Sequence, residues 1–199
     1  MLARTDRRAY SIETAVTIGD QTLQLRATAR SPQVYRVKVG RDLFVDLDKM
    51  RTKYLKILNL ELDEHGELVR LDTDELTIFA DIFYLFHSQA QPDTPWRSSA
   101  EMLDDLPVLP AAILIPEVLR IWNANKMTIN APKESHPQTV REFSTALYLL
   151  RCAELGLSSD DLDALTIGAV SDMLAEKADD RVTFNLKATP ELMEKLFGG

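Results

Sequence analysis

Apolar residues recur at steps of three and four along most of this 199-residue chain, and this helical period limits its fold more than any other feature. The stretch from Asp42 to Leu58 shows the period clearly, with apolar residues at Leu43, Leu47, Met50, Tyr54, Ile57 and Leu58. A second helix is expected to begin at Thr73 and to carry a broad apolar face from Leu76 to His87, and a third is expected from Pro110 to Asn125. The chain is therefore predicted to be mainly α-helical.

Residues 13–30 depart from the helical period and alternate as β-strands do. Val16 and Ile18 alternate with their neighbours, and Leu23, Leu25 and Ala27 alternate with polar residues. Gly19-Asp20 separates the two runs and is typical of the tight turn of a β-hairpin. Because a two-stranded hairpin is marginal in water on its own, this one is expected to lie on helices or on the hairpin of another copy.

Residues 126–138 read KMTINAPKESHPQ and have two prolines, several polar side chains and no apolar period. We interpret this stretch as a linker. It divides the chain into an N-terminal domain of hairpin and helices, residues 1–125, and a small helical C-terminal extension, residues 139–199.

The extension is expected to contain several short helices. The first runs from Thr139 to Leu155, with four apolar residues predicted to point inward: Val140, Phe143, Leu147 and Leu150. Two more follow over residues 160–165 and 167–178, hinged at Thr166, whose hydroxyl is suited to cap the second. A stray strand is expected over residues 181–186, and a last helix from Thr189 to Phe197.

Charge is unevenly spread along the chain, whose net charge is −8. Residues 1–58 contain 12 Lys/Arg and 6 Asp/Glu, a balance of +6, so the remainder carries −14. The acidic bulk argues against nucleic-acid binding, because phosphate attraction would have to overcome it. The basic part is expected to be a solvated surface, to touch an acidic partner, or to pair with the acidic remainder, within one chain or between copies.

Signals for enzymatic chemistry are absent or weak, so no enzyme, cofactor or metal site is expected. His65, His87 and His136 fall in three separate elements, and none has a metal-ligand partner at the usual spacing. Cys152, the single cysteine, excludes an internal disulfide and is predicted to be an inert buried thiol. There is no apolar stretch of membrane-spanning length and no secretion signal, so we expect a cytoplasmic protein without membrane contact.

Three segments together resemble one protein family. The first runs from Leu23 to Met50 and contains RATAR, Tyr35-Arg36 and Gly40-Arg41-Asp42. The second is PDTPWRSSAEMLDDL with the helix that ends LRIW, and the third, Thr145 to Asp180, contains LGLS and LTIGAVSDM. In this order, over roughly half the chain, they resemble the tail assembly chaperones of long-tailed, siphovirus-type phages that infect Gram-positive bacteria.

The resemblance implies a non-enzymatic assembly factor. In that family a longer form, made by ribosomal frameshifting, adds a C-terminal extension to a shared N-terminal domain, and this chain is similar to the longer form. The family coats the helical tape-measure protein, keeps it soluble, helps to recruit tail-tube subunits and then leaves. The resemblance therefore implies action in the host cytoplasm and absence from the mature virion.

Two candidate contact surfaces follow. The tape-measure contact is expected on the apolar residues of the C-terminal helices, although these same residues are equally expected as the core of the extension: Phe143, Leu147, Leu150, Leu165, Val170, Met173 and Leu174. Four arginines are candidates for self-association or tail-tube contact: Arg26, Arg30, Arg36 and Arg41. The main alternative function is a small acidic helical adaptor that binds a transcription-associated protein, and a weaker one is a hydrolase that uses acidic residues.

Overall fold

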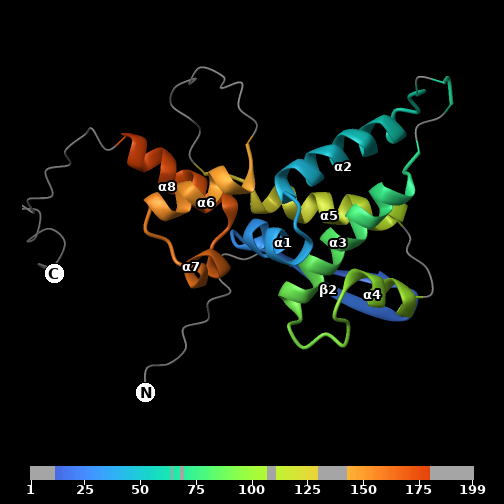
Figure 1. Ribbon diagram of the computed structural model, residues 1–199, viewed down its shortest axis with the longest axis horizontal. Coiled ribbons are helices and arrows are strands. Elements are labelled where there is room, and N and C mark those ends of the chain that lie inside the picture. Colours follow the sequence, from blue (N-terminus) through green and yellow to red (C-terminus); the bar gives the residue numbers. More distant parts are fainter. Residues whose placement is uncertain (1–11, 64, 68–69, 107–110, 130–142, 180–199) are drawn as a thin grey trace, which may run out of the picture.

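The computed structural model describes residues 12–63, 65–67, 70–106, 111–129 and 143–179, and over these ranges the fold is mainly helical with one β-hairpin (Figure 1). The expected fold class is confirmed. In chain order the elements are β1 (Ile12–Ile18), β2 (Gln21–Ala27), α1 (Ser31–Val39), α2 (Leu43–Leu58), α3 (Thr73–Ala90), α4 (Ser99–Asp105), α5 (Ala111–Asn125), α6 (Thr145–Glu154), α7 (Ser159–Ala164) and α8 (Ile167–Asp179).

The predicted hairpin forms, with β1 and β2 antiparallel and Val16 opposite Leu23. Gly19 takes a positive φ of 59° in the turn, a conformation that glycine adopts without steric cost. One face of the hairpin is buried, including Val16, Ile18 and Leu25. This face lies on α3 and α5, so the hairpin is stabilised by helices of its own chain.

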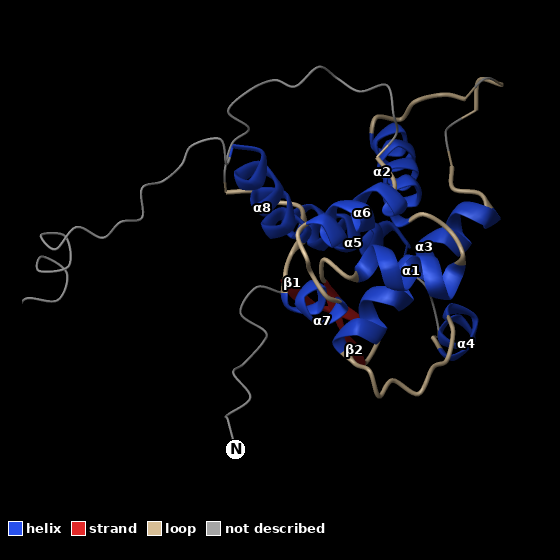
Figure 2. Cartoon of the chain, turned by 60° about the vertical axis from the view of Figure 1, so that its left-hand side comes forward, coloured by secondary structure: helices blue, strands red, loops and turns tan. Residues whose placement is uncertain are grey.

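Helix α3 is the centre of the core, because its sequence is apolar nearly all round. Nine consecutive side chains from Ile78 to Phe86 include only one acidic residue, Asp81, and the eight others are buried. The helix begins with a capping box, in which the Asp72 side chain accepts from the Glu75 N–H and the Glu75 side chain accepts from the Asp72 N–H. Helices α1, α2, α4 and α5 all pack against it (Figure 2).

The three C-terminal helices share one hydrophobic core with the elements before residue 126. Backbone hydrogen bonds make the join: the Ala29 N–H donates to the Leu165 carbonyl at 2.8 Å, and the Arg30 N–H donates to that of Leu162 at 3.1 Å. The Tyr148 hydroxyl also donates to the Ala29 carbonyl, at 3.1 Å. The helices of the extension therefore pack directly on the segment that follows β2.

The prediction that Phe143, Leu147 and Leu150 point inward is wrong. Its buried residues are Thr145, Tyr148 and Cys152, whereas Phe143 and Leu150 are about half exposed. Leu150 lies on a different stripe of α6 from these buried residues, and Phe143 precedes the helix. Tyr148 turns inward because a buried carbonyl accepts its hydroxyl hydrogen. The Thr166 cap is confirmed, since its hydroxyl accepts from the Ala169 N–H at 3.1 Å.

Several expectations lie outside the described residues. They are the first residues of the helix predicted from Thr139, including Val140, the greater part of the linker, the strand over residues 181–186 and the helix from Thr189 to Phe197.

Candidate protein-binding groove

Helices α2 and α5 enclose two adjoining hollows of about 240 Å³ and about 720 Å³ on the molecular surface. Arg51, Leu119 and Asn123 line both, so the two hollows are neighbours, and we name them together the α2–α5 groove. It is lined by Phe44, Val45, Leu47, Asp48, Arg51, Tyr54, Leu55, Pro116, Leu119, Arg120, Trp122, Asn123, Ala124, Lys126, Met127 and Phe143.

The Asp42 carboxylate connects the start of α2 with the start of α6 at one end of the groove. It caps α2 by accepting from the Phe44 N–H at 3.1 Å, and it accepts from the N–H of Thr145, the first residue of α6, at 2.7 Å. The start of α6 is thereby held beside the start of α2.

Aromatic rings gather at this end of the groove. The Phe44 ring lies with its centroid 5.5 Å from that of Trp122 and 4.8 Å from that of Phe143, the latter in an edge-to-face arrangement. Phe143 comes from the segment just before α6, and Trp122 comes from α5. Three segments far apart in sequence therefore build this wall.

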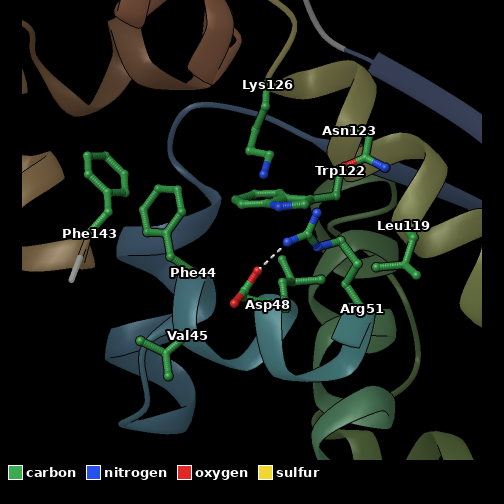
Figure 3. A pocket seen from close by; sticks show the side chains of 10 residues that line it. Phe44, Val45, Asp48, Arg51, Leu119, Trp122, Asn123, Lys126 and Phe143 are labelled. Carbon is green, nitrogen blue, oxygen red and sulfur yellow. Dashed lines mark hydrogen bonds and ion pairs between the residues drawn. The ribbon is translucent and has the colours of Figure 1, made fainter. Parts of the chain in front are cut away.

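Two basic side chains, Lys126 and Arg51, lie on opposite sides of the Trp122 ring (Figure 3). The Lys126 amino group lies 5.7 Å from the Trp122 ring centroid, and Figure 3 draws the Arg51 guanidinium on the other side of that ring. Arg51 is paired with Asp48 at 2.8 Å. Partial burial and the charge of Arg51 lower the pKa of Lys126 below its ordinary value of 10.5, and Asp48 offsets part of this effect. The Lys126 amino group and the Arg51 guanidinium therefore both lie beside the aromatic floor of the groove.

The rim of the groove is apolar and exposed. Met127 is 72% exposed, Phe143 50% and Leu55 48%. Leu58, the last residue of α2, and Leu60 and Leu62 just after it are also exposed. Single exposed apolar residues are ordinary on protein surfaces, but a row of them along a hollow is typical of a surface that binds another protein.

Helix α8 holds one rim of the groove in place. Gly168 lies so close to the backbone of Met127 that a Cβ atom there would overlap the Met127 carbonyl oxygen. Asp172 accepts from the Ile129 N–H at 2.9 Å. The C-terminal helices therefore support the groove through the segment that follows α5.

The seven apolar residues predicted for partner binding do not form one surface. Val170 is fully buried, and Leu147, Leu165 and Leu174 are half buried. Phe143, Leu150 and Met173 are exposed, but among the seven only Phe143 lines the groove. The core interpretation thus applies to Val170, while the exposed members remain available for contact.

The four candidate arginines all face acidic groups of the same chain. Arg30 pairs with Asp163 at 2.7 Å, which joins the basic N-terminal part to the acidic C-terminal part. Arg26 lies 3.7 Å from Glu13, and Arg36 lies 4.0 Å from Asp42. Arg41 pairs with both Asp46 and Asp81, at 2.9 Å each. Pairing with the acidic remainder of the same chain, one of the alternatives predicted, is therefore observed for Arg30 and Arg41.

Two of the described side chains with catalytic potential, those of His87 and Cys152, lie in the core. His87 is buried, with Nδ1 3.0 Å from the Gln24 carbonyl oxygen and Nε2 3.1 Å from the Thr94 hydroxyl, and burial lowers its pKa below 6.5. Cys152 is buried as predicted, and burial raises the pKa of its thiol, which opposes formation of the reactive thiolate. No group of three His, Cys, Asp or Glu side chains suited to a metal ion occurs within the described ranges.

Sequence reasoning missed the groove, although one signal pointed to it. The core face of α2 includes Leu43, Leu47 and Met50, whereas Val45 and Leu55 are apolar residues that lie outside the core and are exposed. A helix with apolar residues on a second face is a candidate for a second contact. The partner wall from α5 and Phe143 has no counterpart in local sequence.

Comparison of the chain with protein families, with curated proteins and with solved structures finds no match. None of the helices in the described ranges combines the length and the apolar character that crossing a bilayer requires.

Proposed function

We propose that this protein is a phage tail assembly chaperone that covers apolar helical surface on a tape-measure protein and helps to recruit tail-tube subunits. The observation that carries the proposal is the α2–α5 groove, with exposed apolar side chains along its rim. The segment resemblance described above supports it independently. In this proposal the protein acts in the host cytoplasm and leaves before the virion is complete.

A tape-measure protein that is not yet covered is expected to aggregate. A tape-measure protein is expected to present long apolar helical stripes before the tail tube surrounds it, and such stripes associate unless they are covered. A groove between two helices covers a stripe by the helix-in-groove mode, in which a few apolar anchors enter hollows. The acidic bulk of the chaperone, at a net charge of −8, then keeps the complex soluble.

Co-expression tests the proposal. The candidate tape-measure protein is sought as the product of a very large helix-rich reading frame next to this gene, and it is expressed alone and together with the full chain. We expect it to move from the insoluble to the soluble fraction and to copurify with this protein. Tail-tube recruitment is then measured by adding tail-tube protein to the purified complex.

Two double variants separate the candidate surfaces. Leu55→Glu with Met127→Glu alters the groove, and Leu147→Glu with Leu150→Glu alters the outer face of α6. We expect the groove pair to reduce copurification at least about tenfold, since charge at a desolvated contact is costly. The control is Val37→Glu, because Val37 is 80% exposed on α1 and lies outside the groove.

Some outcomes would count against the proposal. If the tape-measure protein stays insoluble and no complex forms, the chaperone function is wrong. Copurification of a polymerase-associated protein in its place would favour the adaptor. If only the α6 pair abolishes binding, the chaperone function stands and the contact surface is the one predicted from sequence.

A further inference from the structure

We propose that the α2–α5 groove binds an amphipathic helix of about three turns whose apolar stripe is flanked by acidic side chains. This inference rests on the proposed function and specifies the chemistry of the segment that the protein covers.

The length follows from α2. Phe44 lies in one hollow of the groove and Leu55 in the other. Eleven residue steps separate them on one helix, which corresponds to roughly 16 Å at about 1.5 Å per residue. A bound helix that runs along α2 therefore needs about three turns to reach both hollows.

The conformation of the occupant follows from the walls. Both long walls are helices, whose N–H and C=O groups are bonded within the helix except where Pro116 interrupts the hydrogen bonding of α5. An extended peptide would find no open sheet edge with which to pair its own backbone, and its polar groups would lie unsatisfied against Leu119 and Trp122. A helix satisfies its own backbone and presents only side chains, so a helix fits this groove.

The charge of the occupant follows from the lining. Three cations, Arg51, Arg120 and Lys126, face the groove with one anion, Asp48, although the whole chain carries −8. Arg51 and Arg120 have carboxylate partners within 2.8 Å, whereas Lys126 forms no ion pair with any described residue. Acidic side chains beside the apolar stripe would complement this excess, and the Lys126 amino group is the one placed to meet them first.

The same charges argue against a second copy as the occupant. A two-fold contact of groove on groove would bring Lys126 and Arg120 of one copy toward those of the other, which is unfavourable. The acidic partner helix is therefore the occupant to which the structure points.

Peptide binding to the purified full chain tests this inference. Three fluorescein-labelled peptides of about 15 residues are compared by fluorescence anisotropy. The first has leucines at three- and four-residue steps flanked by glutamates, the second has lysines in place of the glutamates, and the third has glutamines in place of the leucines. We expect the first to bind at least about tenfold more tightly than either of the others, and more weakly as salt rises.

Variants assign the site. Met127→Glu is expected to weaken the acidic peptide about tenfold or more, and Val37→Glu is the matched control. Lys126→Glu is expected to reverse the preference between the acidic and basic peptides, whereas Arg97→Glu, an exposed position outside the groove, leaves it unchanged.

The inference is overturned if the acidic and basic peptides bind equally, if neither binds saturably, or if the groove variants have no effect. It is also overturned if Met127→Glu changes the mass of the free protein by sedimentation, which would make the groove a contact between copies. A lower urea midpoint of the free Met127→Glu protein would also overturn the inference, because it would indicate that Met127 is covered by another part of the same chain and not by a partner. Because the co-expression assay uses no designed peptide, failure here with success there leaves the proposed function standing.

Discussion

The Asn125→Ala variant tests whether the C-terminal helices are joined to the rest of the fold as the structure describes. Asn125 is fully buried at the end of α5. Its Nδ2 donates to the Thr28 carbonyl at 3.3 Å, and its Oδ1 accepts from the N–H of Ile167, the first residue of α8, at 3.3 Å. One side chain therefore links the segment after β2, the end of α5 and the start of α8.

The expected cost depends on which groups lose their partner. The Thr28 carbonyl keeps the Ser31 N–H at 3.1 Å, so it stays satisfied without Asn125. The Ile167 N–H belongs to the first turn of a helix and has no acceptor there, so it is left buried and unpaired, which costs about 1–3 kcal/mol. We expect the free energy of unfolding to fall by about 2 kcal/mol relative to a matched change in helix propensity.

Asn123→Ala supplies that match, because Asn123 is exposed two residues earlier on the same helix. Urea unfolding of both variants, followed by tryptophan fluorescence, gives the difference, and amide hydrogen exchange at Ile167 should be faster only in Asn125→Ala. If the free energies of unfolding of the two variants agree within about 0.5 kcal/mol, the Asn125 side chain does not hold the helices together.

Three further outcomes are expected. Gly168→Ala should destabilise the fold by about 1–3 kcal/mol, measured by urea unfolding, although alanine favours helix, because the added methyl group meets the backbone of Met127; no loss would contradict this packing. The contribution of His87 to the free energy of unfolding should be greatest above pH 6.5 and should fall below it by up to about 1.4 kcal/mol per pH unit. The reason is that the His87 pKa is lowered in the folded state, so below pH 6.5 the unfolded chain binds a proton more readily than the folded chain. His87→Gln should remove this slope in urea titrations. Cys152 should react with a thiol reagent far more slowly in the native protein than in urea, and rapid native labelling would refute its burial.

Local patterns predicted the local structure well. The hairpin was predictable because alternation and the Gly19-Asp20 turn both act within a few residues. Ser158 and Asp161 form a capping box at the start of α7, a motif that depends only on neighbouring side chains.

The face of α6 was not predictable in the same way. Its sequence supports two apolar stripes, one through Leu147 and Leu150 and one through Tyr148 and Cys152. The choice between them depends on the Ala29 carbonyl, more than a hundred residues away in sequence, which accepts from Tyr148. Periodicity alone carries no information about such a distant partner.

The groove was hidden for a related reason. Its walls come from α2, from α5 and from Phe143, which local patterns treat as separate elements. Surplus apolar residues on α2 indicated that a second contact was needed, but only the packed structure shows what stands opposite them.

Site-specific photo-crosslinking tests the central claim most directly. A photoreactive phenylalanine is placed at Met127 and, in a separate protein, at Val37, and each is irradiated with the co-expressed tape-measure protein. We expect a crosslink from Met127 to an acidic amphipathic helix of the tape-measure protein and none from Val37, because only the first position lies on the groove. Crosslinks from Val37 alone, or from neither position while the two proteins still copurify, would contradict the account.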